Sequence, residues 1–336
     1  MVVTQDFRYT PIISLGDYTH NLMKALSSKY FCKLISIVFA IILFTFVGSI
    51  GGSGYAWADT FCGYEKCGNP NATLRKKLKD SEKCKEGKNN DYEFFPAPKT
   101  SDVTVLSIHG GGIEEYTSEI SHDLSQRYGW SRYDFNGHIK TKKCLELAPP
   151  QSKNPNFTVL HITSNYFDEK NAFNLVSSHE NAVSIHGYSR KEEAGIQTIC
   201  VGGRNTEKIK KFINYVSQES YQLKGSLNYS LNLVNVPLYQ ANLEKNIAVP
   251  ERNTICLKNE ALKQRALTGT SQKNIVNKTR NSSGGLQIEL KKKIRADLAE
   301  GKDEPQASSP NKNQLLRNVI YGGIEAAMSE RVIARR

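Results

Sequence analysis

Residues 107–114, with the sequence Ser-Ile-His-Gly-Gly-Gly-Ile-Glu, place a histidine and a glutamate on either side of a glycine turn. Both side chains are good zinc ligands, so His109 and Glu114 are candidates for binding one metal ion. The glycines alone are equally compatible with a structural turn. They do not form a P-loop, because no Lys-Ser/Thr pair follows them.

Other residue types that suit hydrolysis occur further along the chain. His186 would complete a set of two histidines and one glutamate, which are the protein ligands of many catalytic zinc ions. Such a site leaves one position to a water whose pKa falls toward ~7. Glu289 suits the role of a base that takes the proton of this water and later protonates the leaving amine. Arg204 and Arg280 are candidates to hold a substrate carboxylate or the developing oxyanion.

Each of these residues also has a structural interpretation. His186 could be a hydrogen-bonded core histidine, Glu289 the solvent-facing residue of an edge strand, and Arg204 an ordinary turn residue. Four further histidines remain possible ligands, namely His122, His138, His161 and His179.

The elements that must position these side chains are read from hydrophobic periodicity. Strands alternate with helices, which predicts an α/β fold with a mixed, mostly parallel sheet flanked by helices. In such a sheet, ligands bind at the carboxyl ends of the strands. Strands are expected at 103–106, 157–163, 181–185, 197–201, 231–236 and 286–290, and helices at 115–127, 207–223 and 315–332.

The first part of the chain has the pattern of a signal peptide. Lysines precede the apolar run 34–47, and Ala56-Trp57-Ala58 follows it. This pattern predicts export with cleavage after Ala58 and a secreted, extracellular protein. The alternative is an uncleaved membrane anchor, although the apolar run is short for a span.

The remaining chain divides by composition. Residues 59–100 form a cysteine-bearing N-terminal segment, expected to be pinned by disulfides, and 101–299 form the catalytic domain with an insertion at about 224–270. Residues 300–312 are predicted to be a disordered linker, and 313–336 a C-terminal helix.

Cysteines and sequons agree with export. The six cysteines after residue 58 predict three disulfides, whose pairing the sequence leaves open. Five sequons predict a glycoprotein if the organism glycosylates its exported proteins. Two of them lie close to candidate site residues, so we do not expect both to be modified; the five are Asn71, Asn156, Asn228, Asn277 and Asn281.

The formal net charge is +12. Segment 1–58 holds four basic and two acidic residues, so the mature chain would keep +10 of this charge. A basic surface attracts polyanions, which favours an acidic polymer or peptide as substrate. The sequence has no nucleic-acid-binding signature, so nucleic acid is not expected as a partner, and neither is a membrane after signal cleavage.

Five blocks of this sequence, in order, resemble the zinc-binding poly-γ-glutamate hydrolase family of phages and bacteria, which is related in fold to zinc carboxypeptidases. The resemblance covers roughly residues 102–295. The first block, His-Gly-Gly-Gly-Ile-Glu followed by Thr-Ser-Glu, is the most specific. The blocks are 109–119, 184–187, 201–204, 274–277 and 285–290.

The resemblance implies a zinc-carboxypeptidase-like fold, zinc (Zn2+) ligands at His109, Glu114 and His186, and a catalytic base at Glu289. It also implies cleavage of γ-glutamyl amide bonds in poly-γ-glutamate. One departure is Lys278, where the family usually has arginine, because an ammonium cannot make the two-pronged carboxylate contact. Two alternatives remain, namely a zinc carboxypeptidase or N-acyl amino acid hydrolase with another substrate, and an inactive secreted binding protein on the same fold.

Overall fold

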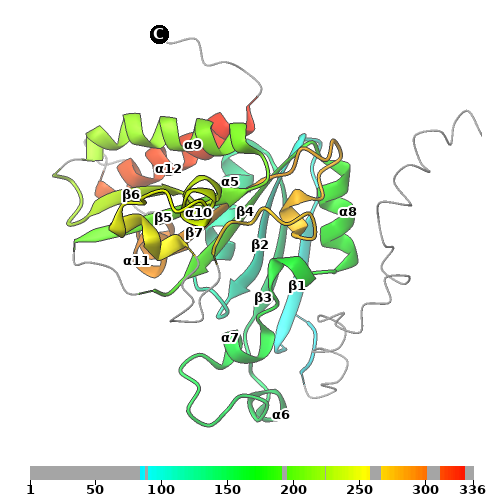
Figure 1. Cartoon of the computed structure of the whole chain (residues 1–336). Helices are drawn as coiled ribbons and strands as arrows, with labels where there is room; N and C mark the ends of the chain where they lie inside the picture. Colours follow the sequence, from blue (N-terminus) through cyan, green and yellow to red (C-terminus); the bar gives the residue numbers. More distant parts are fainter. Residues whose placement is uncertain are drawn as a thin grey trace, which may run out of the picture. The chain divides into compact units, whose positions relative to one another are not determined.

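The structure is a computed structural model that describes residues 84–87, 90–190, 195–223, 225–257, 266–300 and 311–329. These residues form one seven-stranded sheet in the order β1-β3-β2-β4-β7-β5-β6, with helices on its faces (Figure 1). Four neighbouring strand pairs are parallel and two are antiparallel. The prediction of an α/β fold with a mixed, mostly parallel sheet is confirmed. The expected signal peptide, Asn71 and most of the expected linker lie outside the described residues.

The strands have the following bounds: β1 Tyr92–Ala97, β2 Val103–Gly111, β3 Ser131–Gly137, β4 Asn181–Tyr188, β5 Ile196–Gly203, β6 Ser230–Asn235 and β7 Leu286–Lys291. The α-helices are α5 Thr117–Tyr128, α6 Lys142–Leu145, α7 Pro155–Leu160, α8 Lys170–Ser178, α9 Thr206–Glu219, α10 Val236–Glu244, α11 Lys292–Glu300 and α12 Lys312–Met328. Short 3-10 helices are η1 Ser164–Tyr166, η2 Ser220–Leu223, η3 Glu251–Cys256 and η4 Ile275–Asn277.

The two faces of the sheet differ in chemistry. Side chains alternate along a strand, so Val183 and Ile185 of β4 face the same side as Ile288 of β7, in a core with α5, α9, α11 and α12. Figure 1 shows α9 and α12 side by side above the sheet. The intervening polar residues of β4 and β7 therefore face the opposite side, which is covered in part by α8 and η4.

Three local predictions were wrong. The β-branched run 157–163 was expected to be a strand, but Pro155–Leu160 is the helix α7. Its N-cap is Asn154, whose side chain accepts a hydrogen bond from Phe157 N at 3.0 Å, and Pro155 suits the first helical turn. The sequence also predicted no strand in the segments that hold β1 and β3, which are interrupted by Pro96 in the first case and by Arg132 and Asp134 in the second.

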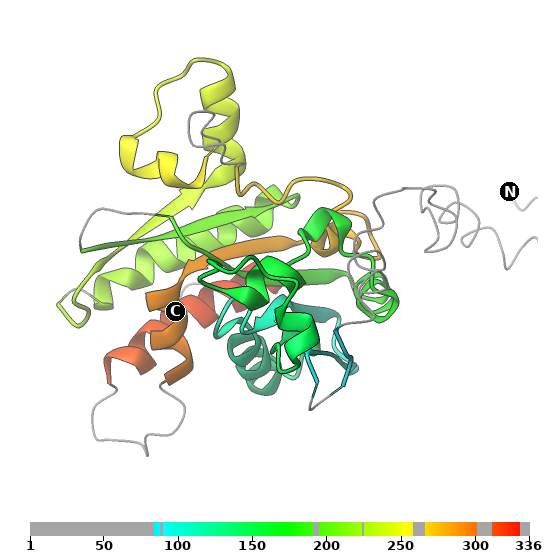
Figure 2. The same ribbon diagram turned by 90° about the horizontal axis from the view of Figure 1, so that it is seen from below.

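Two disulfides are present among the described residues. Cys84–Cys144 joins the N-terminal segment to α6, which confirms that this segment is pinned by a disulfide. Cys200–Cys256 joins β5 to η3. Figure 2 shows α10 and the chain after it, in yellow, extending to one side of the sheet. No helix in the described ranges has both the length and the apolar character needed to cross a membrane.

Candidate active site

A tight turn after β2 brings the first histidine and glutamate together. Gly111 has a φ of 64°, a left-handed conformation that favours glycine, and a Cβ there would lie 2.8 Å from Gly137 O. The turn closes with a hydrogen bond of 2.8 Å from Glu114 N to His109 O. As a result, His109 Nδ1 lies 3.0 Å from Glu114 Oε1. The glycines therefore act as the sequence predicted, as a turn that lets both side chains reach one point.

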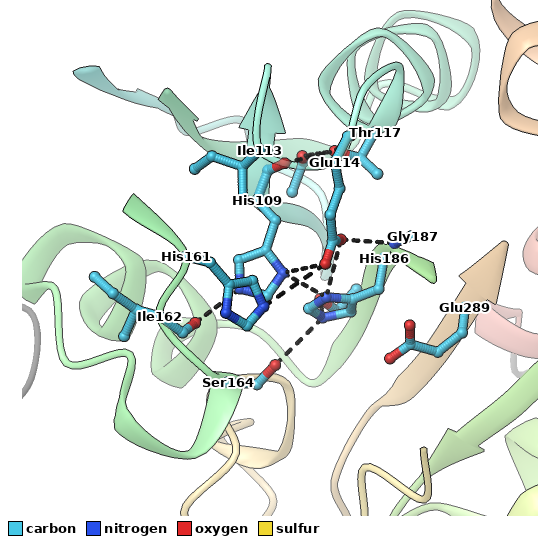
Figure 3. A network of polar contacts seen from close by, with 12 residues as sticks. His109, Ile113, Glu114, Thr117, His161, Ile162, Ser164, His186, Gly187 and Glu289 are labelled. Carbon is cyan, nitrogen blue, oxygen red and sulfur yellow. Dashed lines mark hydrogen bonds and ion pairs between the residues drawn. The ribbon is translucent and has the colours of Figure 1, made fainter. Parts of the chain in front are cut away.

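His186 joins this pair from the neighbouring strand β4. Its Nδ1 lies 3.1 Å from His109 Nδ1 and 3.7 Å from Glu114 Oε2 (Figure 3). Glu114 Oε2 also accepts a hydrogen bond of 2.6 Å from Gly187 N. All three side chains are nearly inaccessible to solvent.

The outer nitrogen of each histidine has its own partner. His109 Nε2 lies 2.7 Å from Ile162 O, and His186 Nε2 lies 2.8 Å from Ser184 Oγ and 3.4 Å from Ser164 Oγ. Such partners fix the tautomer of a metal-binding histidine and leave the other ring nitrogen for the metal. In both rings the nitrogen left for a metal is Nδ1.

The spacing of these donor atoms fits one small cation. Ligand atoms on a tetrahedral zinc with bonds of ~2.0–2.1 Å are about 3.3–3.4 Å apart. Here His109 Nδ1 lies 3.0 Å from Glu114 Oε1 and 3.1 Å from His186 Nδ1, and His186 Nδ1 lies 3.7 Å from the other carboxylate oxygen, Oε2. In addition, two unprotonated Nδ1 atoms 3.1 Å apart need a proton or a cation between them. The donor set therefore suits a divalent metal.

A third imidazole lies at the same cluster. His161 follows α7, its ring packs on Phe157 at 4.3 Å between centroids, and its Nε2 lies 3.8 Å from Glu114 Oε1. Donor atoms of His109, Glu114 and His161 all lie within 4.8 Å of one another. The structure thus brings His161, which the sequence offered as one of four further possible ligands, to the site. His179 is different, because its ring nitrogens contact Leu175 O and Ser131 Oγ.

Glu289 lies directly across from His186 on the adjacent parallel strand β7. Gln287 Nε2 donates a hydrogen bond of 2.8 Å to Glu289 Oε1, and Asn274 Nδ2 donates one of 2.7 Å to Gln287 Oε1. This chain of side chains fixes the orientation of the carboxyl. The sequence pattern Gln-Ile-Glu already placed both polar residues on one face of a strand, but it did not reveal their contact.

The two carboxyls of the site have opposite pKa shifts. Burial would raise the pKa of Glu114, but His109 and then His186 outweigh it and hold this pKa well below its ordinary value. Burial raises the pKa of Glu289 to about 7, with the nearby negative Glu114 acting in the same direction. A carboxyl that titrates near 7 suits proton transfer at neutral pH.

The structure does not bring the two predicted arginines to this cluster. Arg204 follows Gly203, which pairs with Leu286 at the amino end of β7. In the same register Arg204 would face Gly285, four residues or about 13 Å from Glu289 at ~3.3 Å per residue. Arg280 Nη2 lies 2.8 Å from Glu180 Oε1 and 3.6 Å from Asp102 Oδ1, both just before strands begin. A role for either arginine at the site is therefore not supported by its position.

The model of the poly-gamma-glutamate hydrolase family matches residues 77–321, which is most of the chain. The chain therefore belongs to the poly-gamma-glutamate hydrolase family.

Curated relatives from Bacillus subtilis (strain 168) are similar over shorter stretches. The chain is 40% identical to the UPF0714 protein YndL over 122 residues, which cover 35% of this chain and 40% of YndL. It is 34% identical to the SPbeta prophage-derived UPF0714 protein YoqZ over 155 residues, which cover 46% of this chain and 49% of YoqZ. The chain thus spans half or less of the length of these relatives.

Two solved structures are also similar to this chain. A bacteriophage poly-gamma-glutamate hydrolase matches with a TM-score of 0.44 and 22% identity, over 74% of this chain and 92% of that one. A zinc-free apo structure of YNDL matches with a TM-score of 0.44 and 24% identity, over 70% of this chain and 90% of that one.

Proposed function

We propose that this protein is a secreted, zinc-dependent amidohydrolase that cleaves γ-glutamyl amide bonds of poly-γ-glutamate. The observation that supports this proposal is the convergence of His109, Glu114 and His186 beside Glu289, in a member of the poly-gamma-glutamate hydrolase family.

The proposed zinc ligands are His109 Nδ1, His186 Nδ1 and the carboxylate of Glu114. When bound, a zinc ion would supply a Lewis acid that acidifies a water and polarises the scissile carbonyl. The protein keeps the ligands in place through Ile162 O, Ser184 Oγ and Gly187 N. His161 offers a further imidazole at the edge of the site, where a substrate carbonyl oxygen would need a hydrogen-bond donor.

Glu289 is the proposed general base and acid. Its buried carboxylate takes a proton from the attacking water and then gives this proton to the leaving nitrogen. Gln287 holds one of its oxygens, so the other oxygen is left to transfer the proton. Proton transfer by one positioned group therefore serves both halves of the reaction.

A polyanionic substrate is supported by charge. The chain carries a formal net charge of +12, of which +10 would remain after cleavage at residue 58, and a basic protein attracts an acidic polymer over long range. The proposed export is supported by the pattern of residues 1–58 and by two disulfides among the described residues, since disulfides persist in oxidising compartments.

One experiment tests the activity. The purified protein is assayed for bound zinc and for shortening of poly-γ-glutamate, with peptides and N-acyl amino acids as competing substrates. Stoichiometric zinc together with depolymerisation supports the proposal. Zinc with cleavage of only the competing substrates would replace poly-γ-glutamate by another amide. Absence of both zinc and cleavage would leave a binding protein on this fold.

Export is tested separately by N-terminal sequencing of the protein recovered from the culture medium. The proposal expects a chain that begins at Asp59. Recovery only from the membrane fraction, with an intact N-terminus, would instead support the anchor.

A further inference from the structure

Arg295 is a buried arginine on α11 that the proposed chemistry does not use. Its side chain is only 5% exposed, whereas Lys292 and Lys293 before it are exposed. In the sequence it ends the basic run Lys-Lys-Lys-Ile-Arg, which gives no sign that one member is buried. A guanidinium is buried only where hydrogen bonds and opposite charges compensate for its lost hydration.

Two hydrogen bonds attach the guanidinium to the backbone of the site. Arg295 Nε donates to Glu115 O at 2.7 Å, and Nη1 donates to Leu290 O at 2.5 Å. Each acceptor belongs to the residue that directly follows a site carboxyl, Glu114 in the first case and Glu289 in the second.

The guanidinium also contacts β4, the strand that carries His186. Gly187 directly follows this histidine, and a Cβ at Gly187 would lie 2.2 Å from Arg295 Nη1. The glycine therefore provides the space that the guanidinium occupies. Gly187 also donates its N–H to Glu114 Oε2, so the same backbone unit touches both the arginine and a proposed ligand.

We infer that Arg295 is a positioning residue that holds the three segments carrying Glu114, His186 and Glu289 at their mutual distances. This inference rests on the proposed function, because it assigns the arginine to the same site. A planar guanidinium with several fixed donors can bridge two carbonyls at once, whereas a lysine ammonium on a flexible stem cannot reproduce that fork.

The charge of Arg295 acts on the same groups. Glu114 and Glu289, which lie buried on either side of His186, are the two carboxyls that most favour its positive charge. Its positive charge offsets part of the repulsion between these two carboxylates. The arginine thus has both a geometric and an electrostatic action on the site, and the two actions can be separated by substitution.

Arg317 of α12 provides a matched control. It is 6% exposed, and its Nε and Nη2 donate to Leu298 O at 3.1 and 2.6 Å. Its carboxylate partner is Asp123 on α5 at 3.4 Å. Loss of this guanidinium removes similar hydrogen bonds from the helical layer without touching a residue next to a proposed ligand.

The test compares R295Q, R295K and R317Q in the full chain by zinc affinity, measured by competition with a chromogenic chelator, together with kcat, KM and Tm. We expect R295Q to weaken zinc binding about 10–100-fold, the usual effect of removing an outer partner of a metal site. Its kcat should fall while KM changes little. R317Q should lower Tm but keep zinc affinity and kcat within about threefold of the unsubstituted protein, because Arg317 is not one of the partners whose loss costs about 10–100-fold.

R295K keeps the positive charge but not the forked hydrogen bonds, so it separates the electrostatic action from the positioning action. It also provides a test if R295Q does not fold. We expect R295K to lose zinc affinity nearly as R295Q does. Wild-type zinc affinity and kcat in R295K would overturn the positioning role, and so would equal zinc affinities in R295Q and R317Q. Zinc binding and poly-γ-glutamate cleavage by the unsubstituted protein test the proposed function independently of these differences.

Discussion

The two ends of the central strands β2, β4 and β7 carry similar polar residue types but use them differently. At the carboxyl end, Glu114, His186 and Glu289 converge with their reactive atoms toward one point. At the amino end, the Asn277 side chain accepts hydrogen bonds from the backbone N–H groups of Arg204 and Gly285, and Arg280 pairs with a carboxylate. The contrast separates polar residues that are held ready for chemistry from polar residues that close turns.

At the amino end, all hydrogen-bonding groups of the Asn277 side-chain amide have partners. Its Nδ2 donates to Gly269 O at 2.6 Å and to Ser271 O at 2.8 Å, and its Oδ1 accepts from Arg204 N at 3.2 Å and Gly285 N at 3.1 Å. The amide has no hydrogen left for a glycan, so the sequon at Asn277 cannot be modified in this fold.

The carboxyl end instead concentrates groups that repel one another. Glu114 and Glu289 are both buried, the pKa of Glu289 rises to about 7, and the Nδ1 atoms of two histidines lie 3.1 Å apart. Perturbed groups of this kind cluster at functional sites, where they lower stability. The two ends contain similar residue types. They differ in whether each polar group is fully hydrogen-bonded, as at the amino end, or lies buried against groups that repel it, as at the carboxyl end.

The largest expected effect comes from the base at the carboxyl end. E289Q should keep stoichiometric zinc but lose ~10²–10⁴ in kcat, the range for general acid–base catalysis. The amide keeps the size of the side chain but cannot take a proton. Depolymerisation of poly-γ-glutamate at saturating substrate measures the loss. An E289Q variant with full kcat would show that another group transfers the proton.

The second prediction distinguishes the imidazoles at the same end. H186A should lose stoichiometric zinc, because its Nδ1 is one of the closest donors to Glu114 and His109. H161A should keep zinc, since the His161 side chain is 21% exposed and that of His186 only 3%, although both rings lie at similar distances from Glu114. Metal analysis after dialysis measures both. The reverse outcome would make His161 the third ligand and His186 a supporting residue.

The third prediction concerns the amino end. N277A should lower the free energy of unfolding by about 1–3 kcal/mol for each buried backbone group left without a partner. R280A, an exposed ion pair at the same end, should change it by only ~0–1 kcal/mol. Both variants should keep zinc and the kcat of the folded protein. A tenfold loss of kcat in R280A or R204A would mean that the amino end takes part in catalysis.

The carboxyl end was largely predictable because local patterns determine it. The glycine turn fixes the distance between His109 and Glu114, and alternation along β4 and β7 puts His186 and Glu289 on one face. His161 was only one of several possible ligands, because its approach depends on α7, where the cap at Asn154 outweighs the β-branched residues.

The amino end was not predictable because it depends on strand direction. Arg204 follows β5, and β5 runs antiparallel to β7. Its carboxyl end therefore meets the amino ends of β2, β4 and β7, opposite to what alternating strands and helices suggest. The position of Arg280 depends on a turn whose partners, Asp102 and Glu180, are far away in the sequence.

The last prediction measures the destabilisation at the carboxyl end through its pH dependence in the metal-free protein. The pKa of Glu289 is about 7 in the folded state and 4.5 in its ordinary state, so the folded protein binds the proton more tightly. The unfolding free energy should therefore fall by up to about 1.4 kcal/mol per pH unit as the pH rises through this window, and level off above 7.

The variant E289Q has no carboxyl to titrate at this position. Its stability relative to the unsubstituted protein should therefore rise with pH over the same range. Urea unfolding of both proteins at pH 5, 6, 7 and 8 gives the difference, in which titrating groups that do not interact with Glu289 cancel. His186 does not cancel, because Glu289 helps to raise its pKa. Bound zinc favours the ionised carboxyl and should flatten the difference. A constant difference in the metal-free proteins would mean that Glu289 is not destabilising, and the contrast between the two ends would then rest on geometry alone.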